Sequence, residues 1–360
     1  MTDAPTTRFA CFAAGHVALA GALFGIVMRG GFLAVALILP SFSASAAPIE
    51  LKLAFFASET SDTFRYGLKP FVDAVNAEGK GLVAIKVYPS GALGKALAEQ
   101  PGLVLEGRAD MAWVVPGQTP YRFPDNDLLE LPGLFHDVRE GTLTYTQMIA
   151  AKALGGYEGF FVIGAYTAAP TIIHSRKPIG SLADLRGQKI RSNNPIGAEA
   201  LKHFGALPTV MPASRIADAI AGGAIDGATL DPTGLFDFGV ARVATNHYLL
   251  GGGGAPLALL MNRKKFDGLP EAAKAIIRKY SGEWAATKWI DLYGASVEQS
   301  LKTIKSDPGR KVVEPSQADR ETARRIYQSL TDAWAASEPH NRELLKRAEA
   351  QLATIRATNR

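Results

Sequence analysis

The sequence predicts an α/β protein built from two lobes. Strand-like and helix-like segments alternate through much of the chain, as in sheets that are covered by helices. The part that follows residue 46, which is 314 of the 360 residues, has the usual length of two domains. A short sequence pattern also recurs once in each half, which favours two lobes of similar construction.

The recurring pattern combines a helix stop, an aspartate turn and a buried strand. It occupies residues 107–113 and 223–229, and in both copies Gly precedes Asp by three positions while Ala follows Asp by two. The match is too short to prove a duplication. Ligands of open α/β sheets bind beyond the carboxyl ends of the strands. We therefore expect residues 113–115 and 229–231 to face one crevice.

The elements expected in the first half follow the alternation. We expect strands at residues 50–56, 83–88 and 109–115, a helix at 64–76, and a partial helix at 95–106 that Pro101 and Gly102 interrupt.

Residues 181–187 predict a short capped helix. Ser181 and Asp184 have the spacing of a capping box. Gly187 suits a left-handed exit from this helix, after which a strand is expected to end at Arg191.

Arg191 is the first candidate for a ligand contact. Asn194 followed by Pro195 predicts a helix start, so Arg191 lies just ahead of a helix N-terminus. A guanidinium group and free helix N–H groups directed at one point suit a carboxylate. The alternative is a structural arginine paired with Asp231 or Asp226.

The last third of the chain is mostly helical by composition. Helical spacing and a favourable Glu271 in the first turn predict a helix over residues 271–293. A short strand is expected at 311–314, followed by closing helices at 318–336 and 341–357.

Residues 1–46 read as a secretory signal. Met28 and Arg29 precede an apolar run, and small residues in an Ala-x-Ala pattern follow it, so cleavage after Ala46 fits best. Residues 28–46 are a complete signal by themselves, which makes Met28 a possible true translation start. A long signal or a membrane anchor at residues 9–27 is the alternative.

Charge and cysteine content exclude several classes of function. Removal of residues 1–46 takes away Arg8, Arg29 and Asp3 and lowers the net charge from +5 to +4, which is scattered and does not suggest nucleic-acid binding. Cys11 is the only cysteine and lies in the signal, so no disulfide or thiol chemistry is expected. The histidines show no metal-ligand spacing, and we expect no metal or cofactor.

Several segments together resemble the substrate-binding proteins of tripartite ATP-independent periplasmic (TRAP) transporters, of the DctP type. No single segment is diagnostic, but their order and spacing span nearly the whole chain after residue 46. The matching segments are residues 87–94, 107–113, 131–135, 182–191, 201–206, 211–212, 225–227, 245–247, 261–262 and 266–270.

The resemblance implies a two-lobed, periplasmic-binding-protein-like (Venus-flytrap) fold with a long helix that spans both lobes. It also implies that an organic acid is enclosed by lobe closure and delivered to membrane permease subunits. In this family the arginine that ends the Lys-Ile-Arg strand holds the ligand carboxylate, a role that falls on Arg191. We assign residues 47–168 and 257–296 to lobe I, and residues 169–256 and 297–360 to lobe II.

Two departures from the family bear on the ligand. The family often has an asparagine in Asp-Gly-x-x-Asn-Pro, and here that position falls on Leu230 or Asp231. Some members carry a second arginine before the Lys-Pro turn, whereas residues 165–171 contain none. We therefore favour a monocarboxylate over a dicarboxylate.

Further candidates for the ligand site come from the same strand ends and loops. Asp231 is either a ligand contact or a turn cap before Pro232. Aromatic residues are more often core than pocket wall, and the polar ones have loop capping as their alternative role. These candidates are Phe56, Ser58, Trp113, Gln118, Asn193 and Phe236.

The predicted function is capture of a small organic acid in the periplasm, without catalysis. One alternative is a sensory module that presents its ligand to a membrane receptor. A periplasmic enzyme on the same scaffold is less favoured, because the sequence has no Ser/His/Asp order, metal spacing or paired acids in a convincing context.

Overall fold

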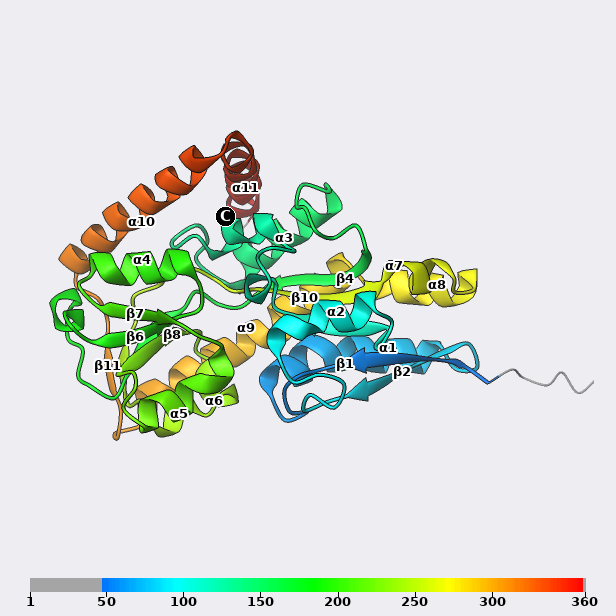
Figure 1. The fold of residues 1–360 in the computed structure, drawn as a ribbon, viewed down its shortest axis with the longest axis horizontal. Helices are drawn as coiled ribbons and strands as arrows, with labels where there is room; N and C mark the ends of the chain where they lie inside the picture. Colours follow the sequence, from blue (N-terminus) through cyan, green and yellow to red (C-terminus); the bar gives the residue numbers. More distant parts are fainter. Residues whose placement is uncertain (1–46, 359–360) are drawn as a thin grey trace, which may run out of the picture. The chain divides into compact units, whose positions relative to one another are not determined.

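The computed structural model describes residues 47–358 of the chain (Figure 1). The predicted signal at residues 1–46, the possible start at Met28 and the alternative anchor lie outside the described residues. Two separate sheets organise the part that is described, and the elements packed around them form lobe I and lobe II. Among residues 47–358, no helix combines the length and apolar character that a membrane span requires.

Lobe I is built on a five-stranded sheet in the order β2-β1-β3-β10-β4. The first three of these strands are parallel, and β10 runs antiparallel to both of its neighbours. The strands are β1 (Ile49–Ala54), β2 (Val83–Tyr88), β3 (Met111–Val114), β4 (Phe160–Thr167) and β10 (Pro256–Asn262).

Both faces of this sheet are buried. Met111 and Trp113 of β3 point into one apolar cluster, and Ala112 and Val114 into another, as the two-residue repeat of a strand requires. Continuous apolar strands are typical of sheets covered on both sides. The associated helices are α1 (Lys69–Glu78), α2 (Gln100–Leu105), α3 (Val138–Ala150), α7 (Arg263–Asp267) and α8 (Glu271–Lys279).

Lobe II is built on a six-stranded sheet in the order β11-β9-β5-β8-β6-β7. Its strands are β5 (Ile172–Ser175), β6 (Lys189–Ser192), β7 (Leu207–Val210), β8 (Gly227–Leu230), β9 (Asn246–Tyr248) and β11 (Lys311–Val313). Short helices connect them, namely α4 (Pro195–His203), α5 (Ile216–Ala221) and α6 (Gly234–Asp237).

The two sheets share a local construction that explains the recurring sequence pattern. In lobe I the backbone of Asp110 donates to the Lys52 carbonyl, and its carboxylate accepts from the Lys52 N–H at 2.8 Å. In lobe II Asp226 makes the same two hydrogen bonds with Lys189, the second at 3.0 Å. In each lobe, therefore, the aspartate fixes a new strand beside an earlier parallel one.

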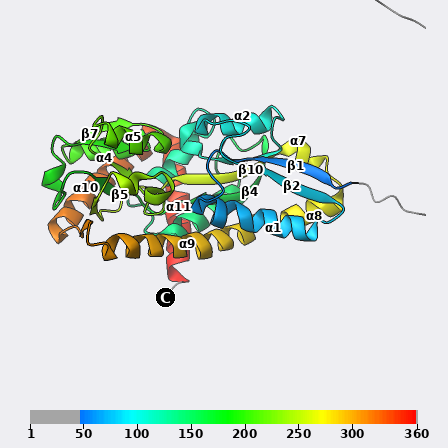
Figure 2. The same cartoon turned by 90° about the horizontal axis from the view of Figure 1, so that it is seen from below.

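Three long helices complete the fold. The helix α9 (Glu283–Ser306) packs against β4 of lobe I and β11 of lobe II (Figures 1 and 2). The helix α10 (Gln317–Ser337) contacts α4 of lobe II, while α11 (Pro339–Ala357) contacts α3 of lobe I. We expected residues 297–360 to belong to lobe II, but Leu344 and Leu345 of α11 enter the apolar core of lobe I, beside Tyr145.

Three predicted helices differ from those in the structure. The helix expected at 64–76 starts as a π-helical segment, η1 (Thr63–Leu68), and continues as α1, because Pro70 has no N–H to donate. Pro101 does not interrupt α2 but lies in its first turn, where a missing N–H costs nothing. The helix expected at 271–293 is broken at Gly282, whose φ of +61° favours glycine.

The elements predicted around residues 181–195 are confirmed. Ser181 and Asp184 form a capping box on a single turn of 3-10 helix (Leu182–Leu185), and Gly187 has a φ of +72°. Asn194 caps α4 by accepting a hydrogen bond from the Gly197 N–H at 2.6 Å.

Candidate ligand-binding site

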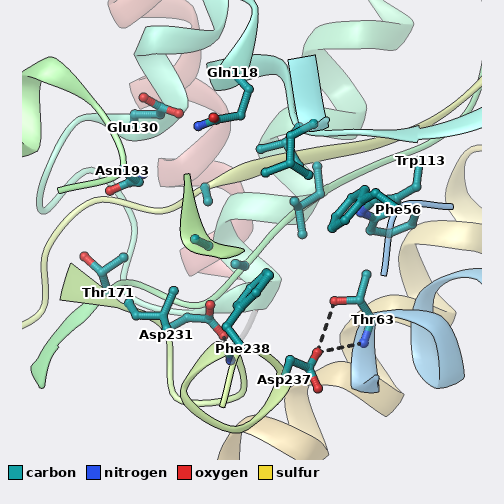
Figure 3. Close-up of a pocket in the computed structure, with 18 of the residues that line it drawn as sticks. Phe56, Thr63, Trp113, Gln118, Glu130, Thr171, Asn193, Asp231, Asp237 and Phe238 are labelled. Atoms are coloured by element: carbon teal, nitrogen blue, oxygen red, sulfur yellow. Dashed lines mark hydrogen bonds between the residues drawn. The ribbon is translucent and has the colours of Figure 1, made fainter. Parts of the chain in front are cut away.

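A cavity of about 90 Å³ lies between the two lobes (Figure 3). Lobe I contributes β3 and the loop after β1, and lobe II contributes β6 and the segments that follow β6 and β8. Trp113 and Val115 line one side, and Leu230 and Asp231 line the other. The expectation that these two strand ends face one crevice is therefore confirmed.

Arg191 is the only basic residue among the described residues that line the cavity. Its side chain is fixed by the backbone, because Nε donates to the Met211 carbonyl at 2.8 Å and Nη1 donates to the Thr229 carbonyl at 3.0 Å. The residue is only 2% exposed. Burial lowers the pKa of Arg191 to about 10, against the opposing effect of nearby carboxyl groups, so the guanidinium stays charged at neutral pH.

No carboxylate oxygen of residues 47–358 lies within 4.0 Å of this guanidinium. The alternative that Arg191 pairs with Asp226 or Asp231 is therefore wrong. Asp226 instead forms ion pairs with Arg176 and Lys177, each at 3.0 Å. Because a buried and unpaired charge is costly, the arrangement calls for an anion from outside the protein.

Asp231 lines the cavity and also caps α6. Its Oδ1 accepts hydrogen bonds from the backbone N–H groups of Thr233 and Gly234 at 3.1 and 3.0 Å, and from the Tyr293 hydroxyl at 2.7 Å. The turn-capping role considered from the sequence is thus present, although Asp231 remains part of the cavity wall.

Glu130, at the end of η4 (Pro124–Glu130), lines the same cavity and is 3% exposed. Burial raises the pKa of the Glu130 carboxyl well above its usual range, and the negative charge of Asp127 adds to this shift. A hydrogen bond from the Asn194 side chain and the charge of Arg191 act in the opposite direction. The net effect is a raised pKa, with burial as its largest cause.

Asp237 adds a third carboxyl group to the wall. It lies at the end of α6 in lobe II, and its Oδ1 accepts a hydrogen bond from the Asp62 N–H of lobe I at 2.9 Å. Longer contacts join its Oδ2 to the backbone N–H and the hydroxyl of Thr63, at 3.4 and 3.5 Å (Figure 3). Burial raises the pKa of Asp237 to about 6.

Aromatic side chains form the opposite part of the wall. Trp113 and Phe56 lie on the side of the cavity away from Glu130 and Asn193 (Figure 3). Trp113 stacks on Tyr166 with ring centroids 5.3 Å apart, while its buried Nε1 has no hydrogen-bond partner among the described residues. A side chain at Gly67 would come within 2.8 Å of the Trp113 ring, so glycine is needed there for the close approach of η1.

The structure brings together six of the eight residues predicted for the site. Arg191, Trp113, Asn193, Asp231, Phe56 and Gln118 all line the cavity. The remaining two line a more open neighbouring hollow: Ser58 is exposed and hydrogen-bonds Thr60, and Phe236 is 38% exposed.

Other residues that line the cavity were not predicted, namely Thr63, Glu130, Thr171, Asp237 and Tyr293. Tyr293 comes from the middle of α9 and Glu130 from the end of η4. No local motif marks either position, because both reach the cavity only through tertiary packing. Among residues 47–358, no group of His, Cys, Asp or Glu side chains is arranged to hold a metal ion.

Comparison with known proteins gives one family. Residues 56–338 match the bacterial extracellular solute-binding proteins of family 7 (DctP). A 2,3-diketo-L-gulonate-binding periplasmic protein of Escherichia coli (strain K12) is 30% identical over 245 residues, which cover 66% of this chain and 74% of the relative. The C4-dicarboxylate-binding periplasmic protein DctP of Rhodobacter capsulatus is 25% identical over 293 residues, 79% of this chain and 84% of the relative.

A solved structure shows the same fold. It is a TRAP solute-binding protein from a marine metagenome, specific for aromatic acid ligands and crystallised with 3-hydroxybenzoate. The TM-score is 0.77 at 24% sequence identity, and the match covers 86% of this chain and 99% of that chain.

Proposed function

This chain belongs to the bacterial extracellular solute-binding proteins of family 7, whose members bind small organic ligands and work with TRAP permeases, and we propose that it captures a small monocarboxylate in the periplasm. In this proposal the ligand carboxylate pairs with Arg191. The two lobes close around the ligand and present it to the membrane permease, and no chemical step takes place.

The observation that carries the proposal is the unpaired guanidinium. Arg191 is buried against the cavity, two of its nitrogens are held by backbone carbonyls, and no carboxylate of residues 47–358 lies within 4.0 Å. These two hydrogen bonds fix the position of the guanidinium in the cavity wall. A carboxylate that docks there forms charge-assisted hydrogen bonds in a site with little water, where such bonds are strong.

The charges of the wall favour one carboxylate over two. The lining residues offer one cation, Arg191, and three carboxyl groups. A dicarboxylate would bring its second charge toward Glu130, Asp231 or Asp237 without a second cation. The proposed ligand class thus differs from that of the C4-dicarboxylate-binding relative.

The size and lining of the cavity favour a compact ligand with an apolar body. Its volume of about 90 Å³ calls for a small ligand. Phe56, Trp113 and Phe238 can contact a ring or a short chain. The aromatic acid bound by the marine metagenome protein is consistent with this class.

A binding screen tests the proposal. Because a ligand of the native state raises the unfolding temperature by mass action, we would screen aromatic, keto, hydroxy and dicarboxylic acids by thermal shift and confirm hits by calorimetry. Monocarboxylates should bind, and Arg191→Lys should weaken binding at least about tenfold because it loses the guanidinium fork. The exposed Arg186→Lys, five residues upstream, is the control. A preference for diacids, or unchanged affinity of the Arg191 variant, would overturn the proposal.

A further inference from the structure

The charges around the cavity do not balance when an anion is bound. One guanidinium, that of Arg191, faces Glu130, Asp231 and Asp237. If all three carboxyl groups were ionised, a bound carboxylate would raise the count to four negative charges against one positive charge. Repulsion between like charges is strong in a site closed to water. At least one of these carboxyl groups therefore carries a proton when the ligand is bound.

The contacts of the three groups single out Glu130. Asp231 accepts backbone N–H groups as the cap of α6, and Asp237 accepts the Asp62 N–H from the other lobe. Among residues 47–358, no backbone N–H donates to the Glu130 side chain, and its hydrogen-bond partner is the neutral side chain of Asn194. Glu130 is also the most buried of the three, at 3% exposed against 8% for Asp231.

The surroundings of Glu130 disfavour its charged form from several directions. Asp127 approaches from the same element η4, and Asp231 and Asp237 share the cavity. Within residues 47–358, Arg191 is the only cation that lines the cavity, and a ligand carboxylate would neutralise its charge. Burial without a counter-ion favours the neutral acid, which can donate a hydrogen bond.

Building on the proposed function, we propose that Glu130 acts in the site as a neutral carboxylic acid that donates a hydrogen bond to the ligand. The site then selects monocarboxylates that carry a hydroxyl or carbonyl oxygen as acceptor, while the negative charges of Asp231 and Asp237 disfavour a second carboxylate. Glu130 is thus a residue that determines specificity, whereas Arg191 provides the general affinity for acids.

The layout of the cavity supports this division. Glu130, Gln118 and Asn193 lie at one end, and the rings of Phe56 and Trp113 lie at the other (Figure 3). A second cavity of about 30 Å³ shares Glu130, Thr171 and Asn193 with the main one. The second cavity has about the space of one water molecule. The Glu130 carboxyl therefore has room for a polar partner in the second cavity, while in our proposal it contacts the ligand in the main cavity.

Calorimetry with matched acids tests the inference. The probes are benzoate, its three hydroxy isomers and isophthalate, together with butyrate and 2-oxobutyrate. We expect at least one hydroxy or keto acid to bind the wild type about 3- to 10-fold more tightly than its parent acid, as one hydrogen bond provides. Isophthalate should bind more weakly than benzoate. If no hydroxy or keto acid gains affinity, the inference is wrong.

Two variants assign the effect to Glu130. Glu130→Gln keeps a neutral donor of the same shape, so the preference and the affinities at pH 7 should stay within about 3-fold of the wild type. Glu130→Leu should lose the preference for hydroxy or keto acids but should still bind the parent acid. If thermal unfolding shows that the leucine variant does not fold, Glu130→Met takes its place in the experiment. A tenfold gain in affinity of Glu130→Gln for all acids would show that Glu130 is ionised, and a preference that survives in the apolar variant would also overturn the inference.

The outcomes separate this inference from the proposed function. If no acid binds the wild type, or Arg191→Lys changes nothing, the proposed function fails. If acids bind through Arg191 but the apolar variant, Glu130→Leu or Glu130→Met, keeps the wild-type preference, only the role of Glu130 fails.

Discussion

Asp237 in lobe II accepts a hydrogen bond of 2.9 Å from the backbone N–H of Asp62 in lobe I. This contact joins segments 175 residues apart at the rim of the cavity. The carboxyl is largely buried, and Asp62 and Asp231 place further negative charge near it. The contact between the lobes therefore includes an acid whose ionised form is disfavoured.

Asp237→Asn should change how stability depends on pH. Burial raises the pKa of Asp237 to about 6 from an ordinary value of 3.8, so the stabilisation gained by protonation is complete below pH 4 and is lost as pH rises through 6. Asparagine stays neutral at every pH. As pH rises from 4 to 7, the free energy of unfolding of the variant should therefore increase relative to that of the wild type by on the order of 1–3 kcal/mol. Urea unfolding at pH 4, 5, 6 and 7 measures this difference, and a constant difference would contradict it.

A pair of buried histidines should make lobe II sensitive to acid. Nδ1 of His174 lies 2.7 Å from Nδ1 of His247, and Nε2 of His174 lies 3.2 Å from the Leu230 carbonyl. Since Arg310 donates to His247 Nε2 at 3.3 Å, His247 must donate from Nδ1 to His174, and His174 must donate to Leu230. Both rings are therefore neutral.

Burial lowers the pKa of His174 to about 3 and that of His247 to about 4. Each neutral imidazole contributes to the free energy of unfolding above pH 6.5. This contribution is lost as pH falls toward 4, by on the order of 2 kcal/mol for each ring. His247→Leu should cost about 1–3 kcal/mol at pH 7, because it leaves buried partners unpaired, and its deficit should shrink at pH 4.5. The exposed His203→Gln is the control, and a deficit independent of pH would argue against the tautomers assigned here.

Trp113 should report ligand binding by its fluorescence. Its ring lines the cavity and its buried Nε1 has no partner among the described residues, so ligand contact should alter its emission. Trp113→Phe should remove most of the fluorescence change on binding. Trp113→Phe should lower the free energy of unfolding by about 1–2 kcal/mol, which is less than the loss expected when a buried ring is truncated to alanine. Trp284→Phe, a partly exposed tryptophan that packs on Tyr280, should leave the change intact. If both variants respond alike, Trp113 does not contact the ligand.

Local sequence signals predicted the arrangement around Arg191, because each part depends on neighbouring residues. The cap of α4 by Asn194 and the left-handed turn at Gly187 form from neighbouring residues and do not depend on distant parts of the chain. The residues missed by sequence reasoning depend on distant packing. Asp237 reaches lobe I only when the lobes meet, and α11 follows α10 in the chain but covers lobe I. The break at Gly282 was also missed, since its neighbours keep helical spacing on both sides.

The packing of α11 on lobe I should depend on Arg356 and Glu140. Arg356 donates from Nε and Nη2 to the two oxygens of Glu140 on α3, at 2.9 and 2.8 Å. Hydrogen bonds from Arg356 are the main cause that lowers the pKa of Glu140 to about 2. Stability from this carboxylate is therefore present above pH 4.5 and is lost as pH falls toward 2.

Glu140→Gln should cost about 1–2 kcal/mol at pH 7, because a bidentate, partly buried pair is replaced by weaker contacts. The exposed pair Arg347 and Glu343, with 3.0 Å between Nε and Oε1 on α11, is the matched control. Glu343→Gln should change stability by less than about 0.5 kcal/mol, since exposed pairs in a helix contribute little. Urea unfolding of both variants at pH 7 and pH 3 tests the pair, because the deficit of Glu140→Gln should shrink at pH 3. Equal effects of the two substitutions would mean that the Arg356 contact does not hold α11 in place.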